Sequence, residues 1–448
     1  MKLELTEKNL NKNILKLSVP IVIENVLHLG VFLSDTIMVG RLGTEAIAAV
    51  GLGGTLFYII SMVFSSFNIG AASIVARHIG AKEQEQAEMV GGQAIVISSL
   101  VSLTITPFLI LFAEKILFLM SAAPDVIVPG TRFLQIVAFS LLFRLLVLTC
   151  NAILRGAGDT KTPMKINLII NSINILFNWL LIFGIGPFPR LGVPGVALAT
   201  VLAYASGTGL LYSRLFAGKY TVRITPYHII QIHINSIKRI FRVSIPAAID
   251  AILTHTGFLF FTKIVTLLGT TALAAHQIAL RVEAMSFMPG LAFAISTATL
   301  VGQSLGKKAP DLALLSMKRC CLFALIFMGS FAVVFLVFPE QIAMIFNPEP
   351  NVLLLASVCI MVAAMEQPAL AIYMVFAGGL RGAGDTLSPM IVTIAGTFIF
   401  LAPMAYLFGI TLGWGLAGVW LAAAIDWIGR AIAIYILFRR GRWKRIKV

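Results

Sequence analysis

An element of eleven residues occurs twice in this chain and shows that the sequence is a duplication. Residues 154–164 read LRGAGDTKTPM and residues 380–390 read LRGAGDTLSPM, so nine of eleven positions are identical at an offset of 226 residues. The same offset aligns Glu24 with Asp250 near the start of each copy. A repeat of this size constrains the fold strongly, because both copies must form similar structural units.

The composition indicates that most of the chain lies in lipid. Hydrophobic residues make up 59% of the 448 positions and charged residues only 12%, a balance that a soluble protein of this length would not need. Apolar stretches of about 20 residues or more can span a bilayer, and each copy contains six of them. They lie at residues 14–39, 46–76, 87–112, 126–153, 162–183 and 193–216, and at residues 240–267, 272–301, 312–338, 352–380, 388–408 and 415–438.

These stretches predict an all-α polytopic membrane protein with twelve transmembrane helices in two six-helix lobes. Because each copy has an even number of spans, both copies enter the membrane in the same orientation and form a parallel repeat. We expect an N-terminal lobe at residues 1–216, a cytoplasmic linker at residues 217–238 and a C-terminal lobe at residues 239–448.

The positive charges predict how the chain is oriented in the membrane. The net charge is +15, yet the predicted outer loops contain only Arg41, Lys115, Arg132 and Arg190. Since short loops rich in Lys and Arg stay in the cytoplasm, both termini are expected there. The excess charge is then a topology signal that also contacts the anionic lipid bilayer, and it does not require a nucleic-acid partner.

The repeated element joins the fourth and fifth spans of each lobe on the cytoplasmic side. Its glycines can end one helix, Asp159 or Thr160 can cap the next, and Pro163 suits the first turn of that helix. A tight turn is therefore the favoured interpretation. The alternative is that Arg155 and Arg381 make contacts across the lobe interface in only one conformation.

Three ionisable residues lie on one face of the first span. An ionisable side chain at the centre of a span costs about 2.5–3.5 kcal/mol on insertion scales, so such residues are candidates for function. Glu24, His28 and Asp35 fall at about 0°, 40° and 20° around a helix. We interpret them as candidate cation-coupling residues.

The fifth span has four asparagines on one face, namely Asn167, Asn171, Asn174 and Asn178. For Asn167 and Asn171 we favour hydrogen bonding between helices, a common use of polar residues in membrane bundles. Asn174 and Asn178 lie at a depth similar to that of Asp35 and are candidates for the same site.

The second lobe contains a polar set of both signs, namely Asp250, Arg281, Glu283 and Glu366. Arg281 and Glu283 are two positions apart and point in different directions, so we expect Arg281 to pair with Glu366 of another helix. A buried ion pair that fixes the lobe explains this set at least as well as cation coupling does.

Four motifs resemble those of a known transporter family. They are the duplicated LRGAGDT, LSVP at residues 17–20, FLSDTIMVGRLG at residues 32–43 and AAHQIALRVEAMSFMPG at residues 274–290. The chain resembles the multidrug and toxic compound extrusion (MATE) transporters, nearest the DinF-like bacterial branch. The resemblance implies a multi-pass protein in the plasma membrane of a prokaryote. It would export organic, often cationic, or other amphipathic compounds in exchange for protons or sodium ions, with no cofactor. A two-lobed carrier needs no partner chain, so we expect a functional monomer.

The resemblance assigns cation coupling to Asp35. Desolvation disfavours the charged form of a carboxyl group, so Asp35 could take a proton from outside and lose it when a cationic substrate arrives. Many prokaryotic relatives have a second aspartate where this chain has Asn178, and a single carboxyl group among amides favours protons over sodium. Phe261 aligns with Asp35 in the second copy, which indicates that the first lobe kept the coupling acid.

Aromatic and methionine side chains near this acid are candidates for substrate binding. Aromatic faces attract organic cations, and Met adapts to varied ligands. The candidate substrate-binding residues are Asp35, Phe57, Tyr58, Met62, Phe64, Phe139 and Phe143. Each of the apolar residues taken singly is more readily explained by lipid contact or core packing, and only the resemblance favours them.

Other functions fit the sequence less well. A sodium-coupled exporter stays open as an alternative. A flippase for a lipid-linked precursor would need a cavity rich in Lys and Arg, whereas the spans supply only Arg144, Lys263, Arg281 and Arg430. An enzyme is not expected, because the chain has no paired His-Glu metal motif, GxSxG elbow or nucleotide loop. The four cysteines lack metal-ligand spacing, so no metal site is expected either.

Overall fold

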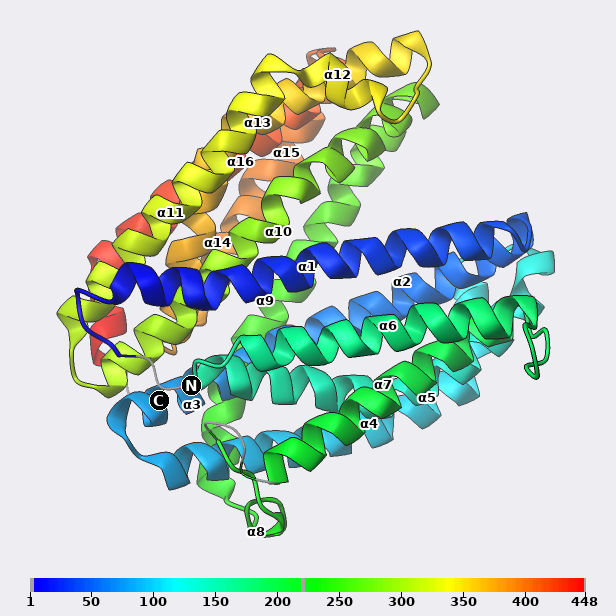
Figure 1. Cartoon of the computed structure of the whole chain (residues 1–448). Helices are drawn as coiled ribbons and strands as arrows, with labels where there is room; N and C mark the ends of the chain where they lie inside the picture. Colours follow the sequence, from blue (N-terminus) through cyan, green and yellow to red (C-terminus); the bar gives the residue numbers. More distant parts are fainter. Residues whose placement is uncertain (1–3, 217, 219–221, 447–448) are drawn as a thin grey trace. The chain divides into compact units, whose positions relative to one another are not determined.

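The computed structural model describes residues 4–216, 218 and 222–446, and over these residues it is built from helices joined by short connections (Figure 1). The first copy forms α1 (Leu10–Gly40), α2 (Thr44–Phe67), α3 (Ile69–Ala81), α4 (Gln84–Leu119), α5 (Pro124–Gly156), α6 (Lys161–Phe183) and α7 (Val193–Phe216). The short helix α8 (Pro226–Ile230) lies in the connection between the copies.

The second copy repeats this order. It forms α9 (Ile234–Thr266), α10 (Thr270–Gly306), α11 (Pro310–Val337), the short α12 (Pro339–Met344), α13 (Pro350–Gly382) and α16 (Gly415–Arg439), followed by the single turn η3 (Arg442–Arg445). The eleventh span is interrupted by two π-helical segments, so it comprises α14 (Leu387–Ile394), η1 (Ala395–Leu401), α15 (Ala402–Tyr406) and η2 (Leu407–Thr411).

The helices have the length and composition that a bilayer requires. Eleven helical stretches among the described residues are long and apolar enough to cross a membrane, and α2 with α3 counts as one of them. Helix α1, at 31 residues, occupies the position of the first expected span; the side chains at positions 29, 32 and 33 lie outside the described set. The chain is thus an all-α polytopic membrane protein with six spans in each copy, as predicted.

The described residues form two compact units. Unit 1 contains residues 20–79 and 83–241, and unit 2 contains residues 4–19, 80–82 and 242–446. The chain therefore passes from unit 2 to unit 1 within α1, at Pro20, and from unit 1 to unit 2 within α9, after Phe241. The expected division at residues 216 and 238 stays a prediction.

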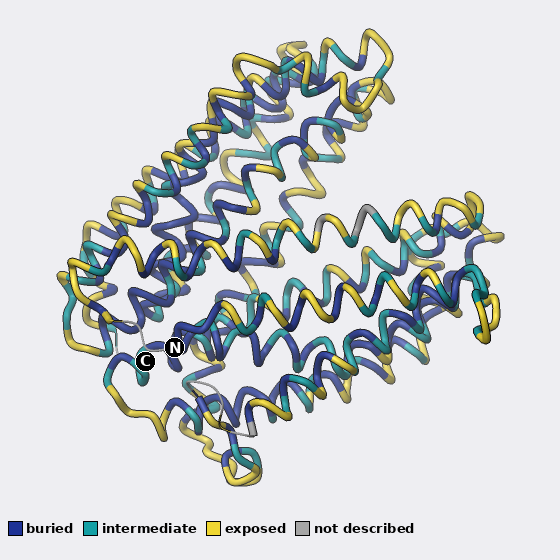
Figure 2. The backbone as a smooth tube through the Cα atoms, viewed as in Figure 1, coloured by how far each residue is buried: buried dark blue, intermediate teal, exposed yellow. Residues whose placement is uncertain are grey.

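Each unit has its own apolar core along its most buried helices (Figure 2). In unit 1 the core is centred on α5, where Leu134, Leu141 and Leu145 are fully buried. In unit 2, α10 and α13 pack along each other, and each has more buried residues than any other helix of this unit. These cores hold the polar residues of the spans in fixed positions.

The duplicated element brings two helices together at the same place in each unit. The end of α5 meets α3 at Gly156 and Ala72, and the end of α13 meets α10 at Gly382 and Ala298. A side chain on either glycine would collide with the backbone of the facing alanine. These are equivalent pairs at the 226-residue offset, so the repeat conserves a close helix contact.

The turn that follows is closed by an aspartate in both copies. Asp159 accepts hydrogen bonds from the backbone N–H of Thr162 at 3.1 Å and from its hydroxyl at 2.7 Å. Asp385 accepts the same pair from Ser388 at the same distances. Gly158, with φ of 87°, adopts a left-handed conformation that L side chains rarely adopt. The interpretation as a tight turn is confirmed.

Candidate functional site

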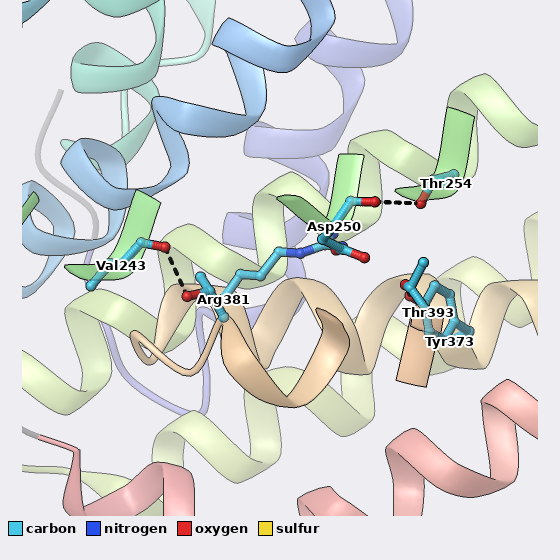
Figure 3. A network of polar contacts seen from close by, with 7 residues as sticks. Val243, Asp250, Thr254, Tyr373, Arg381 and Thr393 are labelled. Atoms are coloured by element: carbon cyan, nitrogen blue, oxygen red, sulfur yellow. Dashed lines mark hydrogen bonds and ion pairs between the residues drawn. The ribbon is translucent and has the colours of Figure 1, made fainter. Parts of the chain in front are cut away.

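The arginine of the repeated element forms an ion pair within its own copy. In unit 1, Nη2 of Arg155 lies 2.6 Å from Oε1 of Glu24. In unit 2, Nη2 of Arg381 lies 2.5 Å from Oδ2 of Asp250 (Figure 3). The two pairs are equivalent at the 226-residue offset, so the duplication preserved an ion pair that ties α1 to α5 and α9 to α13. The alternative considered for these arginines, a contact across the lobe interface, is not needed to explain them.

Glu24 is the more completely satisfied of the two acids. It is 4% exposed, and its Oε1 also accepts a hydrogen bond from Nδ2 of Asn167 at 2.7 Å. Asn167 therefore bonds between helices, as the sequence predicts. Because Arg155 balances its charge, Glu24 belongs to a structural cluster separate from Asp35, and the expectation that the acids of the first span act together is not supported by these contacts.

Asp35 is the end of a polar chain that crosses three helices of unit 1. Its Oδ1 accepts a hydrogen bond from Nδ2 of Asn178 at 2.6 Å, and the same Nδ2 lies 3.2 Å from Oδ1 of Asn174. Nδ2 of Asn174 in turn donates to Oγ1 of Thr200 at 3.4 Å. The chain thus links α1, α6 and α7.

Among the described residues, Asp35 is surrounded by neutral hydrogen-bonding groups and has no counter-ion. Asn178 is fully buried, Asn174 is 7% exposed and Asp35 itself is half-buried. None of the ion pairs between described residues includes Asp35. A carboxylate held by a neutral amide can be balanced by a proton or by an external cation, which is the chemistry that cation coupling requires.

The other polar residues predicted on these two helices lie apart from this chain. The side chain of His28 is exposed, and that of Asn171 is buried with no hydrogen-bond partner for its Nδ2. Thr200 was not among the residues predicted from the sequence. A lone threonine in an apolar span carries no distinctive signal, and only the packing of α7 against α6 reveals its role.

An unexpected cation lies among the aromatic residues of unit 1. Nη1 of Arg144 donates to the hydroxyl of Tyr204 at 2.6 Å, and its guanidinium carbon lies 4.6 Å from the ring centroid of Phe57 and 5.0 Å from that of Tyr204. From the sequence, Arg144 was predicted only to be a cation within a span. The structure shows that aromatic faces already hold one cation here.

The candidate substrate-binding side chains do not form one surface. Phe57 and Phe64 belong to the apolar core of unit 1, whereas Tyr58 and Phe139 are about half exposed. Met62 and Phe143 are intermediate in exposure. Phe57 and Phe64 could contact a substrate only after a rearrangement of the core.

The predicted ion pair between Arg281 and Glu366 is wrong. Glu366 is 1% exposed and interacts electrostatically with Glu283, while Arg281 is exposed. Arg281 instead lines a pocket of about 500 Å³ together with Gln277 and Glu349. Positions 281 and 283 lie about 200° apart on a helix, and it is the face with Glu283 that packs against α13.

The contact between Glu283 and Glu366 has a chemical consequence. Two ionised carboxylates offer only acceptors, so a hydrogen bond between them requires a proton on one of the two. Repulsion between like charges favours the same result. Two carboxyl groups this close in unit 2, of which Glu366 is buried and Glu283 half-buried, can share a proton.

A second buried ion pair in unit 2 was missed. Nε of Arg430 donates to Oδ2 of Asp426 at 2.7 Å, and Nη2 donates to Oγ1 of Thr397 in the π-helical segment η1 at 3.0 Å. The spacing of four residues between an acid and a base in an apolar span was the available signal.

Within residues 4–216, 218 and 222–446, no group of three or more His, Cys, Asp or Glu residues could hold a metal ion.

Known proteins agree with this architecture. The profile of the MatE family matches residues 20–180 and 246–407, two segments separated by the 226-residue offset. A "Probable multidrug resistance protein NorM" of Thermotoga maritima is 28% identical over 437 residues, which cover 97% of this chain and 94% of the relative. An "FAD transporter" of Shewanella oneidensis is 26% identical and covers 95% of this chain and 94% of the relative.

A solved structure shows the same fold. It is the "Outward-facing conformation of a multidrug resistance MATE family transporter of the MOP superfamily", with a TM-score of 0.90, 23% identity and coverage of 98% of this chain and 97% of that chain. Assignment to the DinF-like branch stays a prediction. The family profile matches far more than half of the chain, in both copies of its repeat. The chain therefore belongs to the MatE family, whose members are membrane transporters and not enzymes.

Proposed function

We propose that this chain exports organic, often cationic, compounds and takes up protons in exchange. Several relatives that match nearly the whole chain have names that describe multidrug resistance. The observation that carries the proposal is the hydrogen bond of 2.6 Å between Asp35 and Asn178, at a carboxylate that forms no ion pair among the described residues. A proton and a cationic substrate would compete for this one charge, and such competition couples their movements in opposite directions.

The repeat supports transport by alternating access. Parallel repeats related by an axis along the membrane normal allow two lobes to rock around a central site. The ion pairs of Arg155 with Glu24 and of Arg381 with Asp250 keep each lobe rigid while it moves. In this proposal the protein works as a monomer in the plasma membrane of a prokaryote, with both termini in the cytoplasm.

Sodium is the alternative coupling ion, and one observation favours it. Oδ1 of Asn178 is buried without a hydrogen-bond partner, and a neutral amide oxygen beside a carboxylate is a ligand for a hard cation. Protons remain the preferred choice, because the cluster around Asp35 contains a single carboxyl group and sodium sites usually gather several oxygen ligands.

An anionic cargo, such as a lipid-linked precursor or the flavin dinucleotide named for one relative, fits less well. Of the cations within the spans, Arg144 is bonded to Tyr204 and Arg430 is paired with Asp426. Recognition of a pyrophosphate requires several cations that converge on one cavity. We therefore place this cargo second.

Dye efflux from proteoliposomes tests the proposal. With a pH gradient alone the protein should drive the efflux of a fluorescent organic cation, and with a sodium gradient alone it should not. Asp35→Asn should abolish efflux, whereas Asp125→Asn, at an exposed acid outside this cluster, should leave it unchanged. Efflux driven only by a sodium gradient would show that sodium is the coupling ion. Normal efflux by Asp35→Asn would show that Asp35 does not couple the cation to the substrate.

A further inference from the structure

The connection between the two copies is fixed to the side of α4 by one buried glutamine. Gln93 is fully buried, and its Nε2 donates to the carbonyl oxygens of His228 and Gln231, each at 2.9 Å. Its Oε1 accepts from the backbone N–H of His233 at 3.0 Å. Gly92 lies directly against the backbone of His228, with no room for a side chain. These contacts fix the position of the connection along α4.

The attachment point coincides with a change in the polarity of α4. The helix has 36 residues and is about 54 Å long, so it extends well beyond a hydrocarbon core of about 30 Å. Its first ten residues include Glu85 and Glu88, whereas residues 94–112 contain no charged residue. The edge of the hydrocarbon therefore lies close to Gln93, and the connection lies at the level of the membrane–water interface.

At this level the connection exposes large apolar side chains. Tyr227 is 55% exposed, Ile230 78%, Ile232 64% and Ile234 61%. Four such side chains within eight residues form an apolar surface of the kind that marks an interaction site. Tyr and aliphatic residues at the interface of a bilayer insert shallowly among lipid headgroups.

The same segment is strongly basic. Residues 214–242 contain six Lys and Arg residues and no Asp or Glu. Of these, Arg214, Arg223, Lys238 and Arg242 are exposed. The nearby acid Glu88 accepts a hydrogen bond from the backbone N–H of Arg223 at 2.9 Å, which fixes the segment without pairing the Arg223 guanidinium.

We propose that residues 222–241 form an interfacial anchor that binds the anionic phospholipid surface of the membrane in which the protein lies. The isoleucines enter the headgroup region, and the basic side chains bind the lipid phosphates on either side of them. Arginine and lysine within reach of an anionic leaflet are attracted to it, whereas zwitterionic lipid offers no such field.

The anchor belongs to the first copy alone. At the 226-residue offset, Gly92 and Gln93 are replaced by Lys318 and Arg319, which are both exposed. Lys318 and Arg319 cannot reproduce the contacts of the first copy. Gly92 leaves room for the backbone of His228, and the buried amide of Gln93 both donates and accepts hydrogen bonds. Of the two copies, the first therefore has the site at Gly92 and Gln93 that binds the connection, and the second does not.

A probe attached between the isoleucines tests the anchor. Gln231→Cys keeps Ile230 and Ile232 and places a thiol on an exposed side chain, and the four native cysteines are buried, so an environment-sensitive dye should react selectively. In nanodiscs with phosphatidylglycerol, shallow nitroxide lipids should quench the dye and iodide in the water should not. In phosphatidylcholine alone, lipid quenching should fall by about fivefold or more, given the attraction expected for each basic residue.

Three variants separate the two parts of the anchor. Arg223→Gln with Lys238→Gln should remove most of the difference between the two lipids, and the matched change Arg132→Gln, at an exposed outer residue, should not. Ile230→Ser with Ile232→Ser should abolish quenching in both lipids. Ile345→Ser, at an isoleucine of equal exposure (77%) in another part of the chain, should have no effect.

Two results would overturn the proposal. Strong iodide quenching without lipid quenching in both membranes would show that the segment is in water and that its isoleucines serve another partner. Equal lipid quenching in phosphatidylglycerol and phosphatidylcholine would show apolar contact without recognition of anionic lipid. Both readouts are independent of transport, so the failure of the proposed export function would not affect them.

Discussion

The duplicated ion pairs lead to a quantitative prediction about stability. Glu24 is 4% exposed and Arg155 has a side-chain exposure of 21%, so Arg155→Met leaves a buried carboxylate that still accepts a hydrogen bond from Asn167. Removal of one partner from a buried ion pair costs about 3–5 kcal/mol. Because Asn167 remains and Arg155 was partly hydrated, we expect the lower end of this range, about 3 kcal/mol.

The opposite substitution should cost less. Glu24→Gln keeps an acceptor for Arg155 and leaves its guanidinium within reach of water, so we expect the loss of about 1–2 kcal/mol that one charged hydrogen bond contributes. The double variant should be more stable than Arg155→Met alone, since no uncompensated charge remains. This non-additivity is the signature of a coupled pair.

The second copy supplies an internal comparison. Among the hydrogen bonds of the described residues, the carboxylate of Asp250 accepts only from Arg381, and its Oδ1 has no partner. The residue equivalent to Asn167 is Thr393, which bonds to Tyr373 instead (Figure 3). Arg381→Met should therefore destabilise the protein more than Arg155→Met does.

Thermal unfolding in detergent measures these differences. The four cysteines are buried, so a thiol-reactive dye reports unfolding as they become accessible. For units of about 200 residues, 1 kcal/mol corresponds to about 2–4 °C in Tm, and Arg155→Met should lower Tm by about 6–12 °C. The reasoning is refuted if Arg155→Met and Glu24→Gln have equal and strictly additive effects, or if Arg381→Met is the milder of the two arginine variants.

Three further predictions concern the polar clusters and the helix contact. Asn178→Leu removes the hydrogen-bond donor to Asp35, and such a bond to a charged group contributes about 1.5–3 kcal/mol. The variant should therefore bind a fluorescent cation about tenfold or more weakly at fixed pH. Unchanged affinity would show that the bond to Asn178 does not support cation binding. Glu366→Gln replaces one carboxyl of the pair with Glu283 by a neutral amide, so Tm should change by no more than about 2–4 °C, and a much larger loss would contradict a shared proton. Gly382→Ala places a methyl group against the backbone of Ala298 and should cost about 1–3 kcal/mol in thermal unfolding, whereas Gly429→Ala, with open space around it, should be neutral; equal effects would argue against the close contact.

The fold could be predicted from the sequence to a large extent. Twelve apolar stretches predicted the number of membrane spans, because bilayer thickness fixes the length of a span. The repeated element predicted the duplication. The glycines and Asp159 of that element also predicted its turn, because local backbone chemistry determines turns and caps.

The partners of the polar residues could be predicted only in part. Helical periodicity placed Asp35 and Asn178 on faces of their own helices, but it does not show which helices are neighbours. Arg281 was assigned to Glu366 by charge alone, and the packing of α10 against α13 turned Glu283 toward it instead. Thr200 carries no charge, so its part in the chain from Asp35 was visible only in the structure.

The most direct test of the account is the count of protons released when a cationic substrate binds. In a weakly buffered detergent solution with a pH indicator, the protein should release protons in proportion to the substrate bound, with the largest release just above the pH at which substrate binding is half-maximal. Asp35→Asn should bind the substrate more weakly and release no proton even when the substrate concentration is raised to restore binding, and Asp125→Asn should release protons as the unmodified chain does. Undiminished proton release from Asp35→Asn would contradict the central claim that substrate and proton compete for this carboxylate.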